Sequence, residues 1–410
     1  MKILSKKQNI LAFIIINFCF FQFLIISSAH AQEPFNISNG DNVMQIGGII
    51  STYAQQRFYA AGVTPKLENN TIKLKDARLD LNCKFGKDID MHLQMDFASL
   101  GYVYDPASPL LNDAYFTYKG WHKAFNIRVG YGKVPYSMNS IIDHEWTPFW
   151  QRPQVTKGDF FSRRDLGLRL DRSFWNQKIK LIAGIYTGTG EVVLGGKNDA
   201  SGSCEYIGRM EIGYPERRTE YEAIIDTKVS NIPNIQLGIN GRYSKRNLPV
   251  GTTFIPGEQG ALVDDPYNFK VIDGKKMIYG GDVAFAYRGI TLQAEAHLLK
   301  ATFQDSTNPL LNFTSSANNK GFFKAGGWLA TANYYSKPLK SIFSARYEEL
   351  NANDLYPGMS KKIAYSYCYQ VKGFHSMIRA EYDKIISQTE SINLSSWKDQ
   401  FRIGWQLVIE

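Results

Sequence analysis

The stretch GDFFSRRDLGLRLD, Gly158–Asp171, places apolar and charged residues at alternate positions. Leu166, Leu168 and Leu170 recur at every second residue, separated by a glycine and an arginine and flanked by aspartates. In a β-strand, successive side chains point to opposite faces. One face of this predicted strand is therefore apolar, and the other carries both signs of charge.

The same period of two runs through the rest of the chain, down to QFRIGWQLVIE at residues 400–410. It predicts strands of about the 9–11 residues that a tilted strand needs to cross a bilayer, some of them longer. We count about sixteen such segments: 43–57, 71–85, 90–98, 112–119, 125–136, 164–173, 177–188, 204–214, 234–245, 277–288, 290–303, 321–335, 341–349, 361–371, 374–386 and 399–409.

The connections between these segments differ in length. Asn231–Pro233, Arg288–Gly289 and Val371–Gly373 are of turn size, whereas 138–163, 246–276 and 304–320 are long and polar or rich in Gly, Pro and Asn. Short turns at one end and long loops at the other are typical of outer-membrane barrels.

The N-terminus has the pattern of an export signal. Three lysines precede the apolar run Ile10–Ile26, and the small residues of AHA at Ala29–Ala31 suit a cleavage site. We therefore predict a signal peptide at residues 1–31 and a barrel domain at 32–410. The alternative is an uncleaved membrane anchor.

Composition narrows the class of protein. The chain has 410 residues and a net charge of +9, about +6 without the three signal lysines (9 − 3), and no basic run that would suit a nucleic acid. Beyond residue 31, no apolar run of about 18 residues predicts a membrane helix, and three sparse cysteines indicate neither a disulfide framework nor a metal site. Aromatic residues make up 14% of the chain.

An exported β-protein of this kind is either a transmembrane barrel or a soluble sandwich, because alternation is the same in both. Three features favour an all-β, antiparallel transmembrane barrel. The polar faces are rich in Gly and Arg, the final segment can close the sheet against the first, and aromatic residues near strand ends suit interfacial girdles. The residues of those predicted girdles are Tyr131, Tyr136, Trp146, Phe149, Trp150, Tyr334 and Tyr335.

Several segments, in order, resemble the phosphate-selective porin O and P family. They are IKLKDARLDL (Ile72–Leu81), NIRVGYGKVPYSM (Asn126–Met138), WQRPQVTKGDFFSRRDLGLRL (Trp150–Leu170) and LIAGIYTGTGE (Leu181–Glu191). The resemblance implies a sixteen-stranded outer-membrane barrel, usually a homotrimer, in which loops fold inward to narrow a channel for small anions such as phosphate.

The polar faces carry about one arginine per strand, and arginine suits an anion path because its guanidinium stays charged and offers a fork of donors. The predicted pore-lining residues are Arg78, Arg128, Arg169, Arg209, Arg242, Arg288, Arg346, Arg379 and Arg402. Asp and Glu residues share these faces, so the alternative is that the arginines are ion-paired wall residues.

The loop 138–163 carries Arg152, Lys157 and Arg163, which would lie at a constriction if the loop folds inward. Trp146, Phe149 and Trp150 would then pack the loop against the wall, and the alternative is an exposed cap. The alternation places Arg164 on the leucine side of its strand, at the membrane rim.

We therefore predict a passive outer-membrane porin for small hydrophilic solutes, in contact with outer-membrane lipid, with no cofactor, no metal and no nucleic-acid partner. An enzyme is not expected, because no nucleophile motif such as GxSxG is present. The alternatives are a surface-interaction barrel without an open pore and a soluble, secreted β-sandwich.

Overall fold

The structure is a computed structural model that describes most of the chain after the predicted signal peptide. The described residues are 35–59, 70–98, 110–121, 125–156, 163–190, 202–218, 222–247, 254–256, 269–272, 274–303, 322–351, 354, 360–387 and 397–409. The signal peptide prediction, residues 1–31, and Lys157 lie outside these ranges. In the described part of the chain, the helices are too short to cross a membrane.

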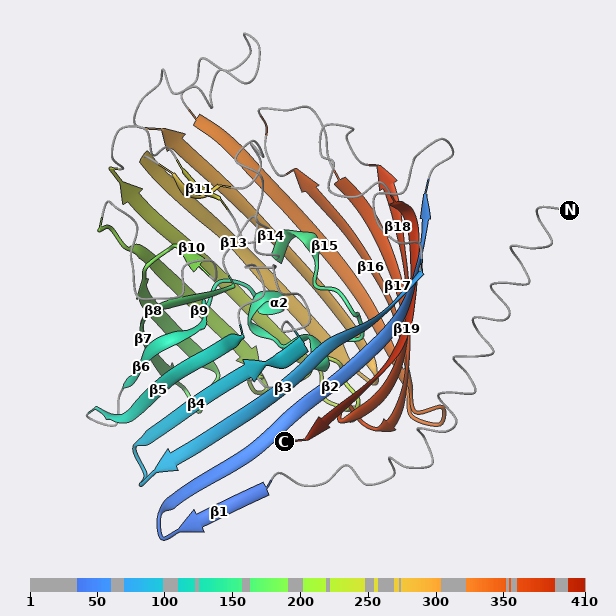
Figure 1. Cartoon of the computed structure of the whole chain (residues 1–410), viewed down its shortest axis with the longest axis horizontal. Coiled ribbons are helices and arrows are strands. Elements are labelled where there is room, and N and C mark those ends of the chain that lie inside the picture. The colour runs from blue at the N-terminus through green and yellow to red at the C-terminus, as the bar shows by residue number, and fades with distance from the viewer. Residues whose placement is uncertain are drawn as a thin grey trace, which may run out of the picture.

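Sixteen antiparallel strands form a closed barrel (Figure 1). They are β2 (Asn42–Tyr59), β3 (Asn70–Phe85), β4 (Ile89–Asp96), β5 (Leu111–Trp121), β6 (Phe125–Lys133), β7 (Arg164–Phe174), β8 (Ile179–Tyr186), β9 (Glu205–Tyr214), β10 (Asn234–Arg246), β13 (Gly274–Tyr287), β14 (Ile290–Phe303), β15 (Phe322–Ser336), β16 (Ser341–Asn351), β17 (Ser360–Lys372), β18 (Ser376–Ser387) and β19 (Trp397–Ile409). Each predicted segment corresponds to one of them, with both ends within three residues.

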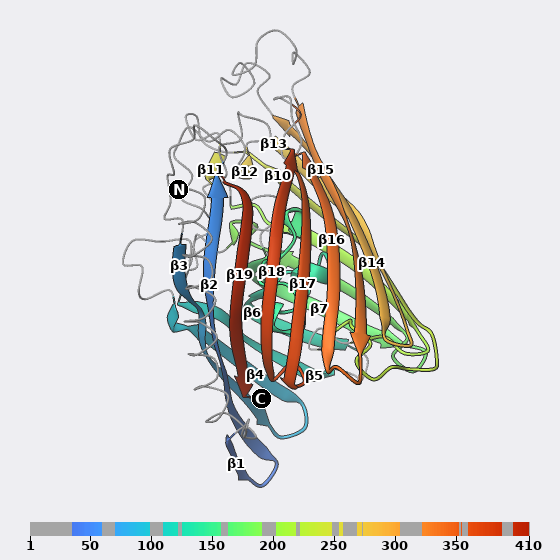
Figure 2. The same cartoon turned by 90° about the vertical axis from the view of Figure 1, so that its right-hand side faces the viewer.

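The last strand closes the barrel against the first. β19 pairs with β2 from Trp397 opposite Tyr59 to Ile409 opposite Gly48 (Figure 2). Closure matters because an open sheet edge in lipid would leave backbone donors and acceptors without partners. We call the rim at which β19 ends the proximal rim, and the opposite rim the distal rim.

Two small elements lie outside the barrel wall. β1 (Phe35–Asn39) pairs with the start of β2, with Phe35 opposite Ile46. β11 (Phe254–Pro256) and β12 (Phe269–Ile272) form a separate two-stranded sheet.

Alternation along the strands gives the barrel an apolar outside and a charged inside. On β10, for example, Leu237, Ile239 and Tyr243 are exposed, while Asn240 and Arg242 are buried. Apolar side chains on the outside of a closed barrel are suited to contact lipid. In a soluble sandwich, the apolar side chains would fill a core instead.

A β-bulge in β3 changes which residues point inward. Ser51 of β2 lies opposite Asp76, but the next residue, Thr52, lies opposite Leu74, so Lys75 is extra. Ile72 and Leu74 are exposed before the bulge, whereas Asp76 and Arg78 are buried after it. A bulge of this kind changes side-chain direction within one strand, and here it brings additional charge to the interior.

The predicted aromatic girdles are only partly correct. Tyr334 is exposed on the outside, as a girdle residue should be. Tyr136, Trp146, Phe149 and Trp150 are instead buried, with exposures of 9% or less. They belong to a segment that folds into the barrel, where aromatic rings pack against the inner wall rather than the membrane interface.

Candidate functional site: a cationic cavity inside the barrel

The segment between β6 and β7, residues 134–163, is the interior loop, described apart from 157–162. Its two ends meet at a hydrogen bond of 2.7 Å from the Val134 amide to the Arg163 carbonyl. Between them lie three short helical turns: α2 (Met138–Ile141), η2 (His144–Trp146) and η3 (Gln154–Thr156). Ser137 caps α2, and prolines at 148 and 153 lie between η2 and η3. The loop crosses the middle of the barrel (Figure 1).

Carboxylates of β13 and β14 bind the start of the interior loop. Glu295 accepts hydrogen bonds from the Ser137 hydroxyl at 2.7 Å and from the Asn139 amide at 2.7 Å. Asp282 accepts one from the Met138 amide at 3.3 Å. These main-chain donors have no helical partner of their own, because they belong to the first turn of α2. The wall carboxylates therefore determine where the loop begins its crossing.

Aromatic side chains attach the middle of the loop to β16 and β18. The guanidinium of Arg346 lies 4.2 Å from the centre of the Phe149 ring, and that of Arg379 lies 4.6 Å from Trp150. Arg379 also donates to the Phe149 carbonyl at 3.1 Å, and the Trp150 indole donates to the Arg379 carbonyl at 3.1 Å. Cation–π contacts strengthen when they are desolvated, and these rings are buried.

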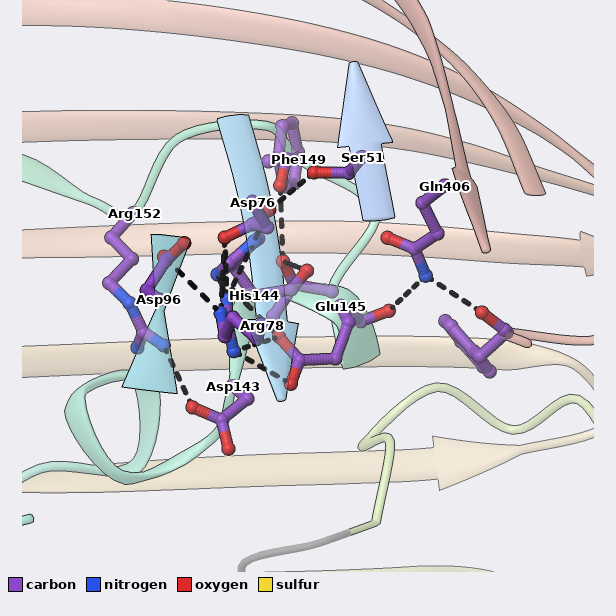
Figure 3. A network of polar contacts seen from close by, with 12 residues as sticks. Ser51, Asp76, Arg78, Asp96, Asp143, His144, Glu145, Phe149, Arg152 and Gln406 are labelled. Carbon is purple, nitrogen blue, oxygen red and sulfur yellow. Dashed lines mark hydrogen bonds and ion pairs between the residues drawn. The ribbon is translucent and has the colours of Figure 1, made fainter. Parts of the chain in front are cut away.

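The loop also joins β19, which is the neighbour of β18, and β3, two strands further along the sheet, through a network of polar contacts (Figure 3). Arg78 donates to Asp76 at 2.7 Å and to Glu145 at 3.2 Å. Gln406 donates to the Glu145 carbonyl at 3.0 Å. Because β13 and β14 hold the start of the loop and lie across the barrel from β3, the loop is attached to the wall on opposite sides of the lumen.

A cavity of about 290 Å³ lies between the loop and the wall formed by β3, β4, β5 and β7. Its lining contains the cations Lys75, Arg78, Arg152, Arg163 and Arg164. The carboxylates in that lining are Asp76 and Asp96, so the lining has three more positive than negative charges (5 − 2 = 3) with His144 neutral. We call this space the cationic cavity.

The positive charges of the cavity repel one another. Burial, and then the charge of Arg163, lower the pKa of Arg152 well below its ordinary value. A negative charge placed among these residues would relieve that repulsion, since opposite charges stabilise each other's charged forms. The lining therefore presents positive charge to a small ion, while Glu145, Asp143 and Asp113 pair with its arginines from behind.

Asp143 of the loop compensates part of this charge from behind. It forms ion pairs with Lys133 and Arg163, and lies 3.7 Å from Arg152. Burial alone would raise the pKa of Asp143, but the charges of Lys133 and Arg163 outweigh it and hold the pKa well below its ordinary value. Asp143 therefore stays ionised and keeps these cations in place.

His144 acts as a neutral hydrogen-bonding group at neutral pH. Burial lowers its pKa well below the ordinary value, despite the neighbouring charge of Asp76. A neutral imidazole can accept a hydrogen bond at one nitrogen. Nδ1 of His144 lies 3.0 Å from the Arg78 guanidinium, and Nε2 lies 2.8 Å from Asp76.

Most of the predicted pore arginines are ion-paired inside the wall, which is the alternative that the sequence left open. Arg209 contacts Asp282 at 2.6 Å and Glu211 at 2.9 Å, and Arg402 contacts Glu381 at 2.7 Å. Further pairs of this kind are Arg169 with Asp171, Arg242 with Glu205, and Arg346 with Glu348. Only Arg78 of the predicted nine lines the cationic cavity.

Arg128 and Arg288 are placed differently from the other predicted arginines. Arg128 is half-buried, with its guanidinium 4.1 Å from the centre of the Tyr115 ring. Arg288 is exposed and lies in the turn between β13 and β14 rather than on the inner wall. The predicted position of Arg288 on the inner face is therefore wrong, because its strand ends one residue earlier, at Tyr287.

Two of the three predicted loop cations, Arg152 and Arg163, lie together in the cationic cavity. Arg164 lies there as well, so the predicted position of Arg164 at the membrane rim is wrong. Instead of facing the membrane rim, it is buried and donates to Asp113 at 2.9 Å and to Gln94 at 3.3 Å. It is the first residue of β7, where the chain leaves the interior loop, so the alternation of the strand does not yet fix its direction.

Sequence reasoning also missed Lys75 and Asp76, because the bulge in β3 interrupts the period of two. A signal was present in the sequence: Ile72 and Leu74 occupy even positions, whereas Leu79 and Leu81 occupy odd ones. A change of parity within one strand is the mark of a bulge.

The fold is that of outer-membrane porins. The solved structure of the DcaP channel of Acinetobacter baumannii superposes with a TM-score of 0.54 at 12% identity, covering 92% of this chain and all of that one. An anion-selective porin from Comamonas acidovorans gives 0.54 at 10% identity, with 90% and 100% coverage. OmpF of Salmonella typhi gives 0.52 at 11% identity, with 92% and 100% coverage.

Residues 48–206 match the model of the phosphate-selective porin O and P family. The matched range contains the interior loop and every charged residue that lines the cationic cavity. A comparison with curated proteins finds no match. The family match and the porin fold together indicate a channel of the outer membrane.

Proposed function

We propose that this protein is an outer-membrane porin through which small anions, phosphate among them, diffuse passively. The observation that carries this proposal is the cationic cavity, where the interior loop and the wall bring five cations around a space of about 290 Å³. A permeating anion exchanges part of its hydration shell for guanidinium and ammonium donors there.

In this proposal, the interior loop is the constriction. Its attachment to β14, β16, β18 and β3 leaves the cationic cavity as a space beside the loop rather than a wide central pore. Arg152 and Arg163 belong to the loop, and Lys75, Arg78 and Arg164 belong to the wall. An anion that passes between loop and wall meets both sets, whereas a cation is repelled by them.

The barrel's place in the membrane follows the same reasoning. Outer-membrane barrels have short turns on the periplasmic side, so we propose that the proximal rim, with its two-residue turn at Arg288–Gly289, faces the periplasm. We further propose a homotrimer and residence in outer-membrane lipid after removal of residues 1–31. The channel needs no cofactor and carries out no chemical reaction.

Insertion of the purified mature chain into a planar lipid bilayer tests the channel function. We expect stepwise increases of current, each small because the interior loop occupies much of the lumen. A folded barrel that inserts without current steps would contradict the proposal and favour the surface-interaction alternative.

A further inference from the structure

The connector between β9 and β10, residues 215–233, folds back into the barrel from the proximal rim, and is described apart from 219–221. Ile224, Ile225 and Asp226 of this connector are buried. The Asp226 carboxylate accepts hydrogen bonds from the Ser230 and Gly289 amides at 2.9 Å each. The connector is therefore a folded element with its own internal bonds.

The connector packs against the interior loop. Ile224 and Ile225 belong to the same apolar cluster as Met138, Ile142 and Trp146 of the loop. Elements that enter the barrel from opposite rims thus meet in its interior. Burial of these side chains against each other holds the two together.

A second cavity, of about 20 Å³, lies where the connector, the loop and the wall meet. This volume holds one particle of about the size of a water molecule. Its charged lining consists of Arg169, Lys180, Arg209, Arg217, Arg218 and Glu211. We call it the connector chamber.

The described residues that line the connector chamber include five cations and one carboxylate, Glu211. Among the described residues, Asp171, Glu211 and Asp282 form ion pairs with four of these cations, Arg169, Lys180, Arg209 and Arg217. Glu216 and Glu222 of the connector are exposed. Asp226 is engaged by main-chain amides.

Arg217 and Arg218 of the connector each have N–H groups that bind no carboxylate among the described residues. Arg218 donates to the carbonyls of Ala223 and Ile224, and within the described residues no carboxylate pairs with it. Nε of Arg217 is buried and has no hydrogen-bond partner within the described residues. A buried donor without a partner costs free energy, and a bound anion would remove that cost.

We propose that the connector chamber is a second anion-binding site, on the proximal side of the interior loop, for a single inorganic anion of about the size of chloride. This inference rests on the proposed channel function and adds the connector to the parts of the chain that select the solute. An ion leaving the cationic cavity would bind here next, and successive weak sites allow conduction.

Single-channel conductance of the full mature chain, measured against KCl concentration, tests the chamber. Conductance of the unchanged protein saturates as the sites fill with chloride. Arg218→Ala raises the half-saturating concentration about threefold, the effect of one unit charge at about 6 Å in water. Arg218→Lys, which retains the charge, stays close to the unchanged protein.

Lys228→Ala is the matched control, because Lys228 is exposed on the same connector and does not line the chamber. Equal half-saturating concentrations for Arg218→Ala and Lys228→Ala would overturn the inference. If Arg218→Ala does not assemble, Lys180→Ala on the wall of the same chamber carries the same expectation. Arg152→Ala tests the cationic cavity separately: a loss of selectivity there, with no effect of Arg218→Ala and Lys180→Ala, would refute the chamber alone.

Discussion

Arginine side chains inside this barrel have two different roles, and their surroundings determine which role each one has. Arg346 and Arg379 donate to main-chain carbonyls of the interior loop and lie against its aromatic rings. Arg152 and Arg163 also donate to loop carbonyls, those of Asn139 and Ser140, but they line the cationic cavity and lie near Asp143. The first group attaches the loop to the wall, and the second group lines the space in which we propose that the solute passes.

Removing a loop cation should weaken anion preference. We expect Arg152→Ala and Arg163→Ala each to lower the ratio of chloride to potassium permeability about threefold, as for one unit charge at about 6 Å in water. Reversal potentials in a salt gradient give this ratio. Arg288→Ala is the control, because Arg288 is exposed in a turn, and an equal loss in this variant would show that only overall charge matters.

Removing one partner of a buried wall pair should instead affect stability. Asp282→Asn leaves Arg209 with Glu211 as its remaining carboxylate and weakens a contact to the loop at the Met138 amide. Because Glu211 also pairs with Arg217, one buried positive charge is then uncompensated, and we expect a loss of about 3 kcal/mol in the free energy of unfolding.

Urea titration of the barrel folded in lipid vesicles measures that loss. Asp90→Asn is the comparison, since Asp90 pairs with Lys119 at a site where both side chains are at least one-third exposed, and it should cost less than about 1 kcal/mol. Equal costs for the two variants would contradict the assignment of Asp282 to a desolvated pair.

At the scale of elements, the interior loop depends on small residues in the wall beside it. A Cβ atom on Gly404 of β19 would lie 2.7 Å from Trp150 and 2.1 Å from the Thr52 carbonyl. The absence of a side chain at this position lets the indole ring of Trp150 lie against the strand. The loop and the strand must therefore fit each other closely.

Gly404→Ala should loosen the loop. Overpacking of this size costs roughly 1–3 kcal/mol, and a displaced Trp150 would free part of the lumen. We expect larger and noisier single-channel currents in a bilayer. Gly208→Ala on β9 meets no atom within 4 Å and should behave like the unchanged protein; a normal current from Gly404→Ala would contradict the role of Trp150 as an anchor.

At the scale of the whole molecule, the closed sheet turns its apolar side chains toward lipid. Ile239 lies near the middle of β10 and is 58% exposed, with Met210 and Gly281 opposite it on the neighbouring strands. A charged side chain on the lipid face near the bilayer midplane costs about 2–4 kcal/mol. Ile239→Arg should therefore lower the free energy of unfolding of the barrel in vesicles by that amount.

Ile232→Arg provides the control for this substitution. Ile232 is as exposed as Ile239, at 59%, but lies in the connector before β10 rather than on the strand. We expect little change from it. A similar cost at both positions would argue against lipid contact at Ile239.

The sequence predicted the sixteen strands because a period of two recurs wherever one face meets lipid and the other meets charge. It could not predict which arginines line the cationic cavity and which are paired in the wall, since that depends on carboxylates of nearby strands, such as Asp282 of β13, which pairs with Arg209 of β9 over the intervening β10. It also misplaced Arg164 and missed Lys75, because the alternation fails at a strand end and at a bulge. The apolar contact of Ile224 with the loop joins segments that are distant in sequence.

Ion selectivity in a planar bilayer is the most direct test of the central claim, that the cationic cavity makes this barrel an anion channel. The reversal potential across a KCl gradient reports which ion carries the current. We expect a potential with the sign of chloride permeation, reduced in Arg152→Ala. A potential with the sign of potassium permeation would contradict the account.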